Sequence, residues 1–108
     1  MSPELEHPLA IEVRSEGGEA TLTLAGELDP HTAPLLADEI EGLIGSGATS
    51  IVLVLADLGF IDSSGLRVVI SADRELTERG GGLVLRSPNE TVRRLLDITG
   101  LLGHLTVE

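Results

Sequence analysis

The sequence predicts an α/β domain, a small mixed β-sheet covered by helices, with the element order β-β-α-β-α-β-α-β. Three observations favour this fold class. Two stretches near the start alternate apolar and polar residues. After them, segments with helical periodicity alternate with segments typical of strands. One of these segments, "SIVLVLA", is a continuous apolar run after its serine. The 108 residues are enough for one domain. We place it at residues 9–108, after a flexible N-terminal arm of residues 1–8 that is polar and holds two prolines.

The alternating stretches predict a β-hairpin. Residues 9–15 place Leu9, Ile11 and Val13 on one face of a strand. Residues 19–26 continue the alternation after a Glu-Gly-Gly turn, so we expect the two strands to pair.

A first helix is predicted within residues 27–47, where apolar side chains recur at helical spacing. Its start has two interpretations. In one, Asp29 is the N-cap and Pro30 is the first helical residue. In the other, Thr32 is the N-cap and Pro34 lies in the first turn. The residues alone leave both starts open.

The second half of the chain alternates strands and helices. The apolar run at residues 50–56 predicts a strand that is buried on both faces. A helix over residues 63–81 and a short strand over residues 82–87 are expected to follow. Residues 101–108 form either a last short strand or an extended tail.

The clearest helix lies within residues 87–100, "SPNETVRRLLDITG". Ser87 is the expected N-cap, Pro88 the first helical residue, and Glu90 the residue that closes a capping box. Its apolar side chains are assigned to the core, and Gly100 is expected to end it.

Composition excludes several classes of function. The net charge is −11, with 18 acidic residues against seven arginines and no lysine, so the surface repels nucleic acids and anionic membranes. We therefore expect no direct nucleic-acid or membrane partner. The chain has no cysteine, and its three histidines lack ligand spacing, so we expect no metal and no cofactor. No apolar run of about 18 residues is present, which favours a cytoplasmic protein.

The stretch "GFIDSSGLRVVI", residues 59–70, contains the DSSG turn, residues 62–65, between a strand and a helix. In one interpretation, its aspartate or a serine simply caps that helix. In the other, a serine is modified, because a helix N-terminus tolerates an added phosphate. The phosphate brings about −1.5 to −2 charges to a patch with Asp57 and Asp62, and Gly65 leaves room for its donor. A serine without a general base is no nucleophile, so we expect no enzyme.

A second acidic stretch, "GELD" at residues 26–29, ends the second predicted strand. It is either a turn with a helix cap or a part of the same site. Loops that follow the carboxyl ends of parallel strands gather at one edge of a sheet, which would bring Asp29 beside the DSSG turn.

Three stretches together resemble the STAS domain, and more narrowly the bacterial anti-sigma factor antagonists: "LAGELDPHTAPLL", "IVLVLADLGFIDSSGLRVVI" and "GGGLVLRSPNETVRRLLDITGLL". The likeness covers about residues 9–107. It implies a small mixed sheet in which the DSSG turn opens a helix. It also implies partner switching. The unmodified protein binds an anti-sigma factor that is also an ATP-dependent serine kinase, and this frees the sigma factor. Phosphorylation ends the binding, and a PP2C-type serine phosphatase reverses it.

The resemblance also implies roles for single residues. Ser63, directly after the aspartate, matches the family's phosphorylated serine, and Ser64 is the alternative acceptor. Arg67 stands where relatives often carry glycine, and Pro30 where they often carry histidine. Arg67 is also a candidate to pair with the phosphate. The residues expected to bind the partner are Asp29, Asp62, Ser64, Gly65, Arg67 and Glu27.

Two rival functions come from other classes. The first is a STAS adaptor subunit of a transporter or of a multiprotein sensor complex. The second is a small nucleotide-binding domain, since the start of a helix can hold a phosphate.

Overall fold

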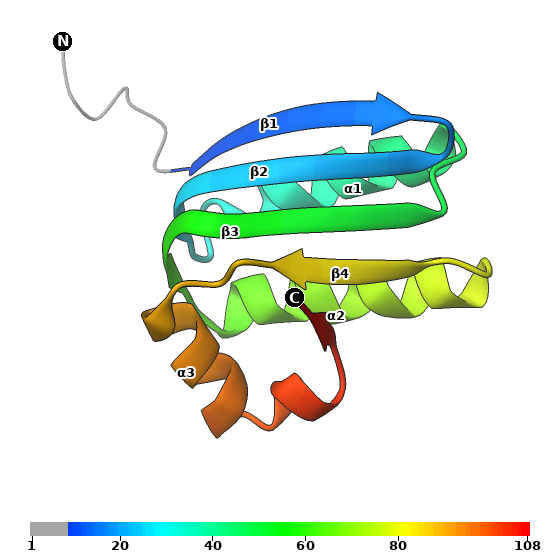
Figure 1. The fold of residues 1–108 in the computed structure, drawn as a ribbon. Coiled ribbons are helices and arrows are strands. Elements are labelled where there is room, and N and C mark those ends of the chain that lie inside the picture. Colours follow the sequence, from blue (N-terminus) through cyan, green and yellow to red (C-terminus); the bar gives the residue numbers. More distant parts are fainter. Residues whose placement is uncertain (1–8) are drawn as a thin grey trace, which may run out of the picture.

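The structure is a computed structural model that describes residues 9–108, so the predicted arm of residues 1–8 lies outside the described residues. Five strands form one sheet in the order β1-β2-β3-β4-β5 (Figure 1). β1 pairs antiparallel with β2, and every later pair is parallel, which confirms the predicted mixed sheet. The elements are β1 (Leu9–Glu16), β2 (Glu19–Leu28), α1 (Ala33–Gly45), β3 (Ser50–Ile61), α2 (Ser63–Glu78), β4 (Gly82–Arg86), α3 (Glu90–Ile98), the short 3₁₀ helix η2 (Leu101–Gly103) and β5 (Thr106–Val107).

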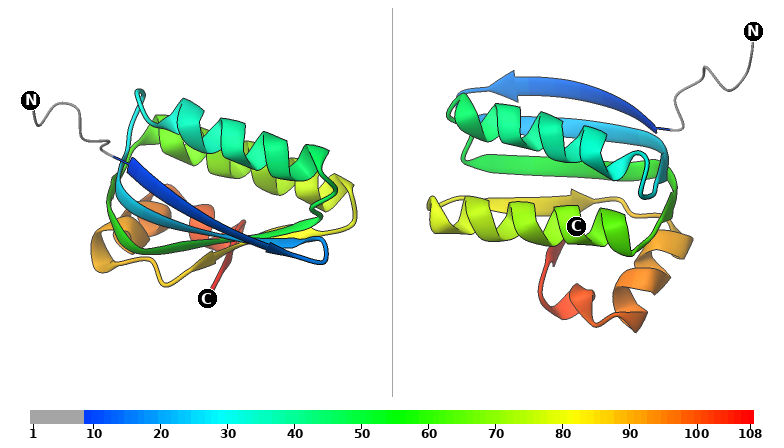
Figure 2. Two further views of the ribbon diagram at one scale, coloured as in Figure 1. Left: turned by 90° about the horizontal axis from the view of Figure 1, so that it is seen from above. Right: turned by 180° about the vertical axis from the view of Figure 1, so that it is seen from behind.

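Helices α1 and α2 lie side by side on one face of the sheet (Figure 2). The period of two along each strand turns alternate side chains toward them. The side chains that fill the space between sheet and helices are Ala20, Leu22, Leu24, Ile51, Leu53, Leu55, Leu83 and Leu85 from the strands and Leu36, Ile40, Leu66, Val69 and Leu76 from the helices. The prediction that β3 is buried on both faces holds only in part. Val52 is buried, but Val54 is half-buried and Ala56 exposed, because the two helices cover one face.

Strands β2 and β3 run further than predicted, and β3 contains two residues more than β2 over their last stretch. β2 advances five residues from Thr23 to Leu28, while β3 advances seven from Val54 to Ile61, with register shifts between these pairs. Such bulges bend a strand and re-aim its side chains. Leu58 and Ile61 are therefore buried, and the two strands end side by side at the same edge.

The start of α1 agrees with one of its two predicted N-caps, whereas the start of α3 differs from the predicted one. Helix α1 follows Thr32 as N-cap with Pro34 in its first turn, as in the second interpretation. The prediction of Ser87 as the N-cap of the last helix is wrong: α3 begins at Glu90, after Asn89. Ser87 adopts a left-handed conformation with φ 59°, and its N–H donates to the carbonyl of Glu108 instead. Asn89 has extended backbone, and its side chain accepts the N–H of Val92, as is typical of a capping side chain.

Candidate functional site

Two turns leave the sheet at its carboxyl edge and lie against each other. Leu28 and Ile61 are the last paired residues of β2 and β3, so the turns that follow them start as neighbours. The N–H of Asp62 donates to the carbonyl of Leu28 at 3.1 Å and links the two turns directly. The expectation that Asp29 lies at the same edge as the DSSG turn is confirmed, because it follows the end of β2 and the turn follows the end of β3. The two strands end side by side (Figure 1).

The start of α2 is capped by Asp62 and by neither serine. Asp62 has extended backbone, and its carboxylate accepts hydrogen bonds from the N–H of Ser64 at 2.8 Å and of Gly65 at 3.2 Å. Ser63 is thus the first helical residue, and its side chain is exposed, whereas Ser64 is half-buried. Capping therefore explains Asp62 but leaves the hydroxyl of Ser63 without a structural role in the cap.

Gly65 is buried, and the reason expected for it is wrong. A Cβ at this position would lie 2.7 Å from side-chain atoms of Leu28 and 2.8 Å from Ile61, so glycine lets α2 begin close to the ends of two strands. A side chain at this position would point into the core, so its absence does not clear space at the surface for a phosphate donor. Gly65 lets α2 start close against the sheet, and its predicted part in binding the partner stays a prediction.

The second turn, which follows β2, is ordered by reciprocal hydrogen bonds between Asp29 and Thr32. The Asp29 carboxylate accepts from the N–H of His31 at 2.9 Å and of Thr32 at 3.0 Å, and the Asp29 N–H donates to Thr32 Oγ1 at 2.9 Å. The Thr32 hydroxyl, itself buried, donates to the carbonyl of Glu27 at 2.8 Å. The first interpretation of this helix start was therefore partly right, because Asp29 caps the turn that precedes α1.

These hydrogen bonds also set the charge of the turn. The pKa of Asp29 is held below its ordinary value, chiefly because the backbone N–H of Thr32 donates to the carboxylate. The N–H of His31, the Thr32 hydroxyl and the nearby His31 ring act in the same direction and outweigh desolvation. Asp29 therefore stays ionised to a lower pH than an ordinary aspartate does, and the exposed side chain of Glu27 lies two residues before it.

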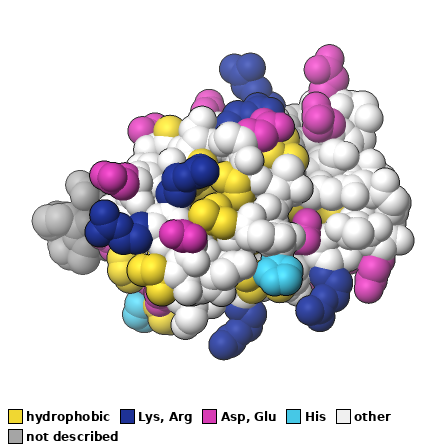
Figure 3. All heavy atoms as spheres, turned by 60° about the horizontal axis from the view of Figure 1, so that its bottom comes forward, with side chains coloured by type: hydrophobic (Ala, Val, Ile, Leu, Met, Phe, Trp, Pro, Cys, Tyr) yellow, Lys and Arg dark blue, Asp and Glu magenta, His cyan; other side chains and the backbone are white. Residues whose placement is uncertain are grey.

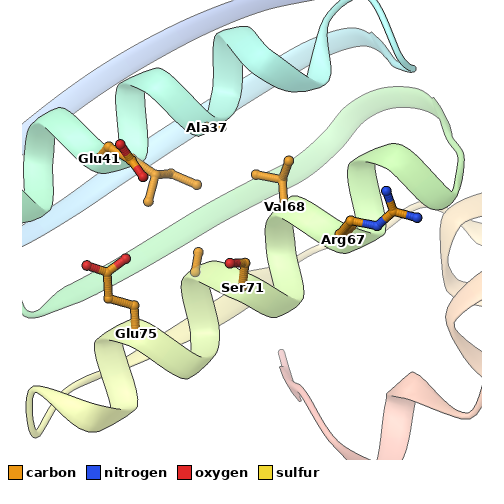
Figure 4. A pocket seen from close by; sticks show the side chains of 8 residues that line it. Ala37, Glu41, Arg67, Val68, Ser71 and Glu75 are labelled. Carbon is orange, nitrogen blue, oxygen red and sulfur yellow. The ribbon is translucent and has the colours of Figure 1, made fainter.

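Arg67 lies on α2 four residues after Ser63, which places both on the same side of the helix. Its exposed side chain lines one end of a groove between α1 and α2 and points toward the first turn of α2 (Figure 4). Glu41 and Glu75 lie at the other end of this groove (Figure 4). The ion pairs among residues 9–108 are Glu75 with Arg79 and Arg86 with Glu108, so Arg67 has no carboxylate partner there.

Sequence reasoning missed Asn89, which fixes α3 next to this edge. Its side-chain oxygen accepts from the N–H of Val92 at 2.9 Å, and its Nδ2 donates to the carbonyl of Leu58, 31 residues away, at 2.6 Å. It also missed Phe60, which pairs with Glu27 across the strands and is 45% exposed. The only available signal was that Phe60 is the one aromatic residue of the chain.

Within residues 9–108, no three histidine or acidic side chains gather closely enough to hold a metal ion. No helix in this same range has both the length and the apolar character needed to cross a membrane.

The family model of the STAS domain matches residues 10–108. The chain therefore belongs to the STAS domain family. Within that family it belongs with the anti-sigma factor antagonists, as its curated relatives show. It is 36% identical to the anti-sigma F factor antagonist of Paenibacillus polymyxa, over 92% of this chain and 86% of that one. It is 33% identical to the anti-sigma-B factor antagonist of Bacillus subtilis, over 84% of this chain and 83% of that one.

Solved structures agree with this placement. The unphosphorylated form of the anti-sigma factor antagonist SpoIIAA matches with a TM-score of 0.80 and 31% identity, over 92% of this chain and 88% of that one. The phosphorylated form of Bacillus SpoIIAA matches with a TM-score of 0.73 and 30% identity, over 92% and 91%. The murine anion transporter Slc26a9 shares the fold alone, at a TM-score of 0.68 and 14% identity over 83% of this chain and 15% of that one.

Proposed function

We propose that this protein is a partner-switching antagonist whose exposed Ser63 is the phosphate acceptor. The unphosphorylated form binds an anti-sigma factor that is also an ATP-dependent serine kinase, and so frees a sigma factor. Phosphorylation releases the antagonist, and a PP2C-type serine phosphatase restores it, all in the cytoplasm. The protein itself catalyses nothing.

The observation that carries this proposal is the cap of α2. Asp62 supplies both cap hydrogen bonds, so the Ser63 hydroxyl is exposed at the first helical residue and is not needed for the fold. A phosphate there meets the positive end of the helix dipole, which favours negative charge. We therefore expect this fold to change little on phosphorylation. Ser64 is the second choice, because its side chain is half-buried.

The release step follows from charge and volume. A phosphate adds about −1.5 to −2 charges to an edge that already presents Asp62, Asp29 and Glu27. It also adds bulk at the first residue of α2, where a partner that covers the DSSG turn must approach. We propose that repulsion from carboxylates of the kinase, or a steric block, weakens the complex. We propose that Arg67 pairs with the phosphate, which its position four residues after Ser63 on α2 supports.

The rival functions have weaker support. A nucleotide phosphate at the start of α2 would need the N–H groups of Ser64 and Gly65, which already donate to the Asp62 carboxylate. The repulsion from that carboxylate would weaken the binding of a nucleotide, because its phosphate, unlike one on Ser63, is not held by a covalent bond. The adaptor role in a transporter rests on a likeness in fold alone.

The test begins with recovery of the anti-sigma factor from the native cell on immobilised Ser63→Ala protein, which no kinase can release through Ser63. The recovered kinase is purified and incubated with ATP and wild-type protein, and intact-mass measurement follows. We expect the gain of one phosphate, its loss in Ser63→Ala, and its retention in the matched control Ser64→Ala. Phosphorylated protein should bind the kinase more weakly than unmodified protein does. Equal affinity of the two forms, or a phosphate elsewhere, would overturn the proposal.

A further inference from the structure

Large apolar side chains stand exposed near the DSSG turn. Four such side chains are exposed among residues 9–108, and three of them, Leu35, Phe60 and Ile98, belong to elements that meet the carboxyl edge of the sheet. Phe60 is 45% and Ile98 73% exposed. The fourth, Val13, lies on β1 at the far side of the sheet. Scattered exposed apolar residues are ordinary, but a group beside a candidate site marks an interaction surface.

Phe60 and Ile98 line one apolar groove between the end of β3 and the outer side of α3. Its lining residues are Phe60, Ile61, Thr91, Val92, Arg94, Leu95 and Ile98. The volume is about 220 Å³, below the roughly 300–1,000 Å³ of pockets that hold small molecules. The groove therefore suits one or two side chains of a protein better than a cofactor.

The groove is held in shape by the side chain of Asn89. Because Asn89 both caps α3 and donates to the Leu58 carbonyl, α3 keeps a fixed place against β3. Val92, at the bottom of the groove, is 1% exposed, which anchors the helix in the core. A preformed surface binds with less ordering cost than a flexible one.

The groove is continuous with the proposed switch. Ile61 lines it and directly precedes Asp62, the cap of the helix that begins with Ser63. The groove and the start of α2 are thus joined through Ile61, two residues before Ser63. Figure 3 shows the face that carries α3, where hydrophobic side chains gather among arginines and acidic residues.

We propose that an apolar side chain of the anti-sigma factor docks in this groove beside Phe60, as a second anchor of the interface centred on Ser63. This inference rests on the proposed function. Arg94 lines the groove, and neither ion pair within residues 9–108 involves it, so a carboxylate next to the docked side chain fits this surface. A second copy of this chain is the poorer occupant, because two chains of net charge −11 repel each other.

The anchor divides the interface into two parts with different tasks. The groove supplies affinity, since buried aromatic side chains are typical hot spots of protein interfaces. The DSSG turn supplies control, since only Ser63 changes its charge. Phosphorylation should thus weaken binding while the remaining affinity still depends on Phe60.

The experiment measures the affinity of unphosphorylated variants for the purified anti-sigma factor recovered as described above. We expect Phe60→Ala to raise the Kd at least about tenfold and Ile98→Ser about threefold to tenfold, as for anchor residues. The matched control Val13→Ser removes an apolar side chain of similar exposure, 37%, outside the groove and should stay within about twofold. Urea unfolding of each variant checks that the fold is intact.

The outcomes separate this inference from the proposed function. If Phe60→Ala and Ile98→Ser bind like wild type while the kinase still phosphorylates Ser63, the groove is not part of the interface, and the proposed function stands. If wild type is neither bound nor phosphorylated, the proposed function fails and the inference fails with it. If wild type forms dimers in sedimentation equilibrium and Phe60→Ala is a monomer, the groove holds a second copy, which overturns the inference.

Discussion

The two ends of the parallel strands build their turns in different ways. At the amino end, backbone conformation shapes the turns: Gly17, Gly18, Gly47 and Gly80 all have positive φ, between 60° and 105°. At the carboxyl end, side chains shape them: the Asp29 and Asp62 carboxylates and the Asn89 amide accept backbone N–H groups. Turns made by glycine carry no side chain at the tip. Turns made by capping side chains are equally ordered but can present a hydroxyl, a carboxylate or an aromatic ring to a partner.

The comparison shows why the candidate site lies at one end only. A phosphate acceptor must be exposed, and an acceptor at the start of a helix is in addition held in a fixed position. Asp62 achieves both for Ser63, since it fixes the first turn of α2 from within and leaves the neighbouring hydroxyl outside. Exposed hydroxyls at the amino end, such as those of Ser46 and Thr49, lie between the end of α1 and the start of β3 and not at the capped start of a helix.

The largest loss of stability is expected from a substitution that disturbs the close backbone packing at the amino end of the parallel strands. A Cβ on Gly81 would lie 1.7 Å from the carbonyl oxygen of Thr49, a backbone atom that has little freedom to move. We expect Gly81→Ala to lower the free energy of unfolding by about 3 kcal/mol or more, measured by urea unfolding with circular dichroism. The neighbouring Gly82→Ala, where no atom lies within 4 Å of the added Cβ, is the matched control. If Gly81→Ala and Gly82→Ala lowered the free energy of unfolding equally, the close contact between Gly81 and Thr49 would not be the cause.

A smaller effect is expected at the carboxyl end from Gly65→Ala. Here the new Cβ meets side chains of Leu28 and Ile61, which can shift, so we expect a loss of about 1–3 kcal/mol. Gly42→Ala, on the exposed side of α1 with open space around it, should instead stabilise by up to about 1 kcal/mol. A Gly65→Ala protein as stable as wild type would show that the start of α2 is looser than the structure has it.

The next prediction concerns the hydrogen bonds by which Asp62 caps α2. Asp62→Ala removes the acceptor of two N–H groups and should cost about 1 kcal/mol of stability. Asp62→Asn keeps an acceptor oxygen and should lie between Asp62→Ala and wild type. Ser63→Ala should change stability by less than about 0.5 kcal/mol, because Ser63 takes no part in the cap. If Ser63→Ala were as damaging as Asp62→Ala in the same urea titration, the division of roles between the two residues would be refuted.

The smallest effect concerns the pH dependence of Asp29. Its folded-state pKa is lowered by the N–H of Thr32, so its ionised form stabilises the fold above the unfolded-state pKa of about 3.9. This contribution is lost as the pH falls through the lower folded-state pKa. We therefore expect the stability difference between wild type and Asp29→Asn to shrink in that acid range. A difference that stays constant from neutral pH into acid would argue against the hydrogen-bonded turn.

Much of the fold follows from periodicity in the sequence. The element order follows from the alternation in β1 and β2, the apolar run in β3 and the helical spacing after β2, β3 and β4. Parallel pairing of β2 and β3 then predicts that Asp29 and the DSSG turn meet. Local patterns cannot show which of two nearby N-cap candidates is used, because contacts with distant residues decide it. Ser87 and Asn89 both suit an N-cap, and the bond from Asn89 to Leu58, 31 residues away, decides between them.

The same limit applies to Gly65 and to the bulges of β3. A glycine reads the same in a sequence whether a side chain at its position would face solvent or core. Only the positions of Leu28 and Ile61 show that a side chain at Gly65 would face the core. The two additional residues of β3 are likewise a property of its pairing with β2. Because no local pattern predicts these two residues, the exposure of Phe60 near the end of β3 could not be predicted either.

Phe60 has one more consequence, for spectroscopy. The chain contains no tryptophan or tyrosine and a single phenylalanine, so it is nearly invisible to the ultraviolet absorbance by which most proteins are followed. For the same reason, the aromatic proton resonances of its NMR spectrum come from this one ring and three histidines. Because the ring is partly exposed and lies three residues before the proposed acceptor Ser63, its signals form a natural, label-free reporter of that region.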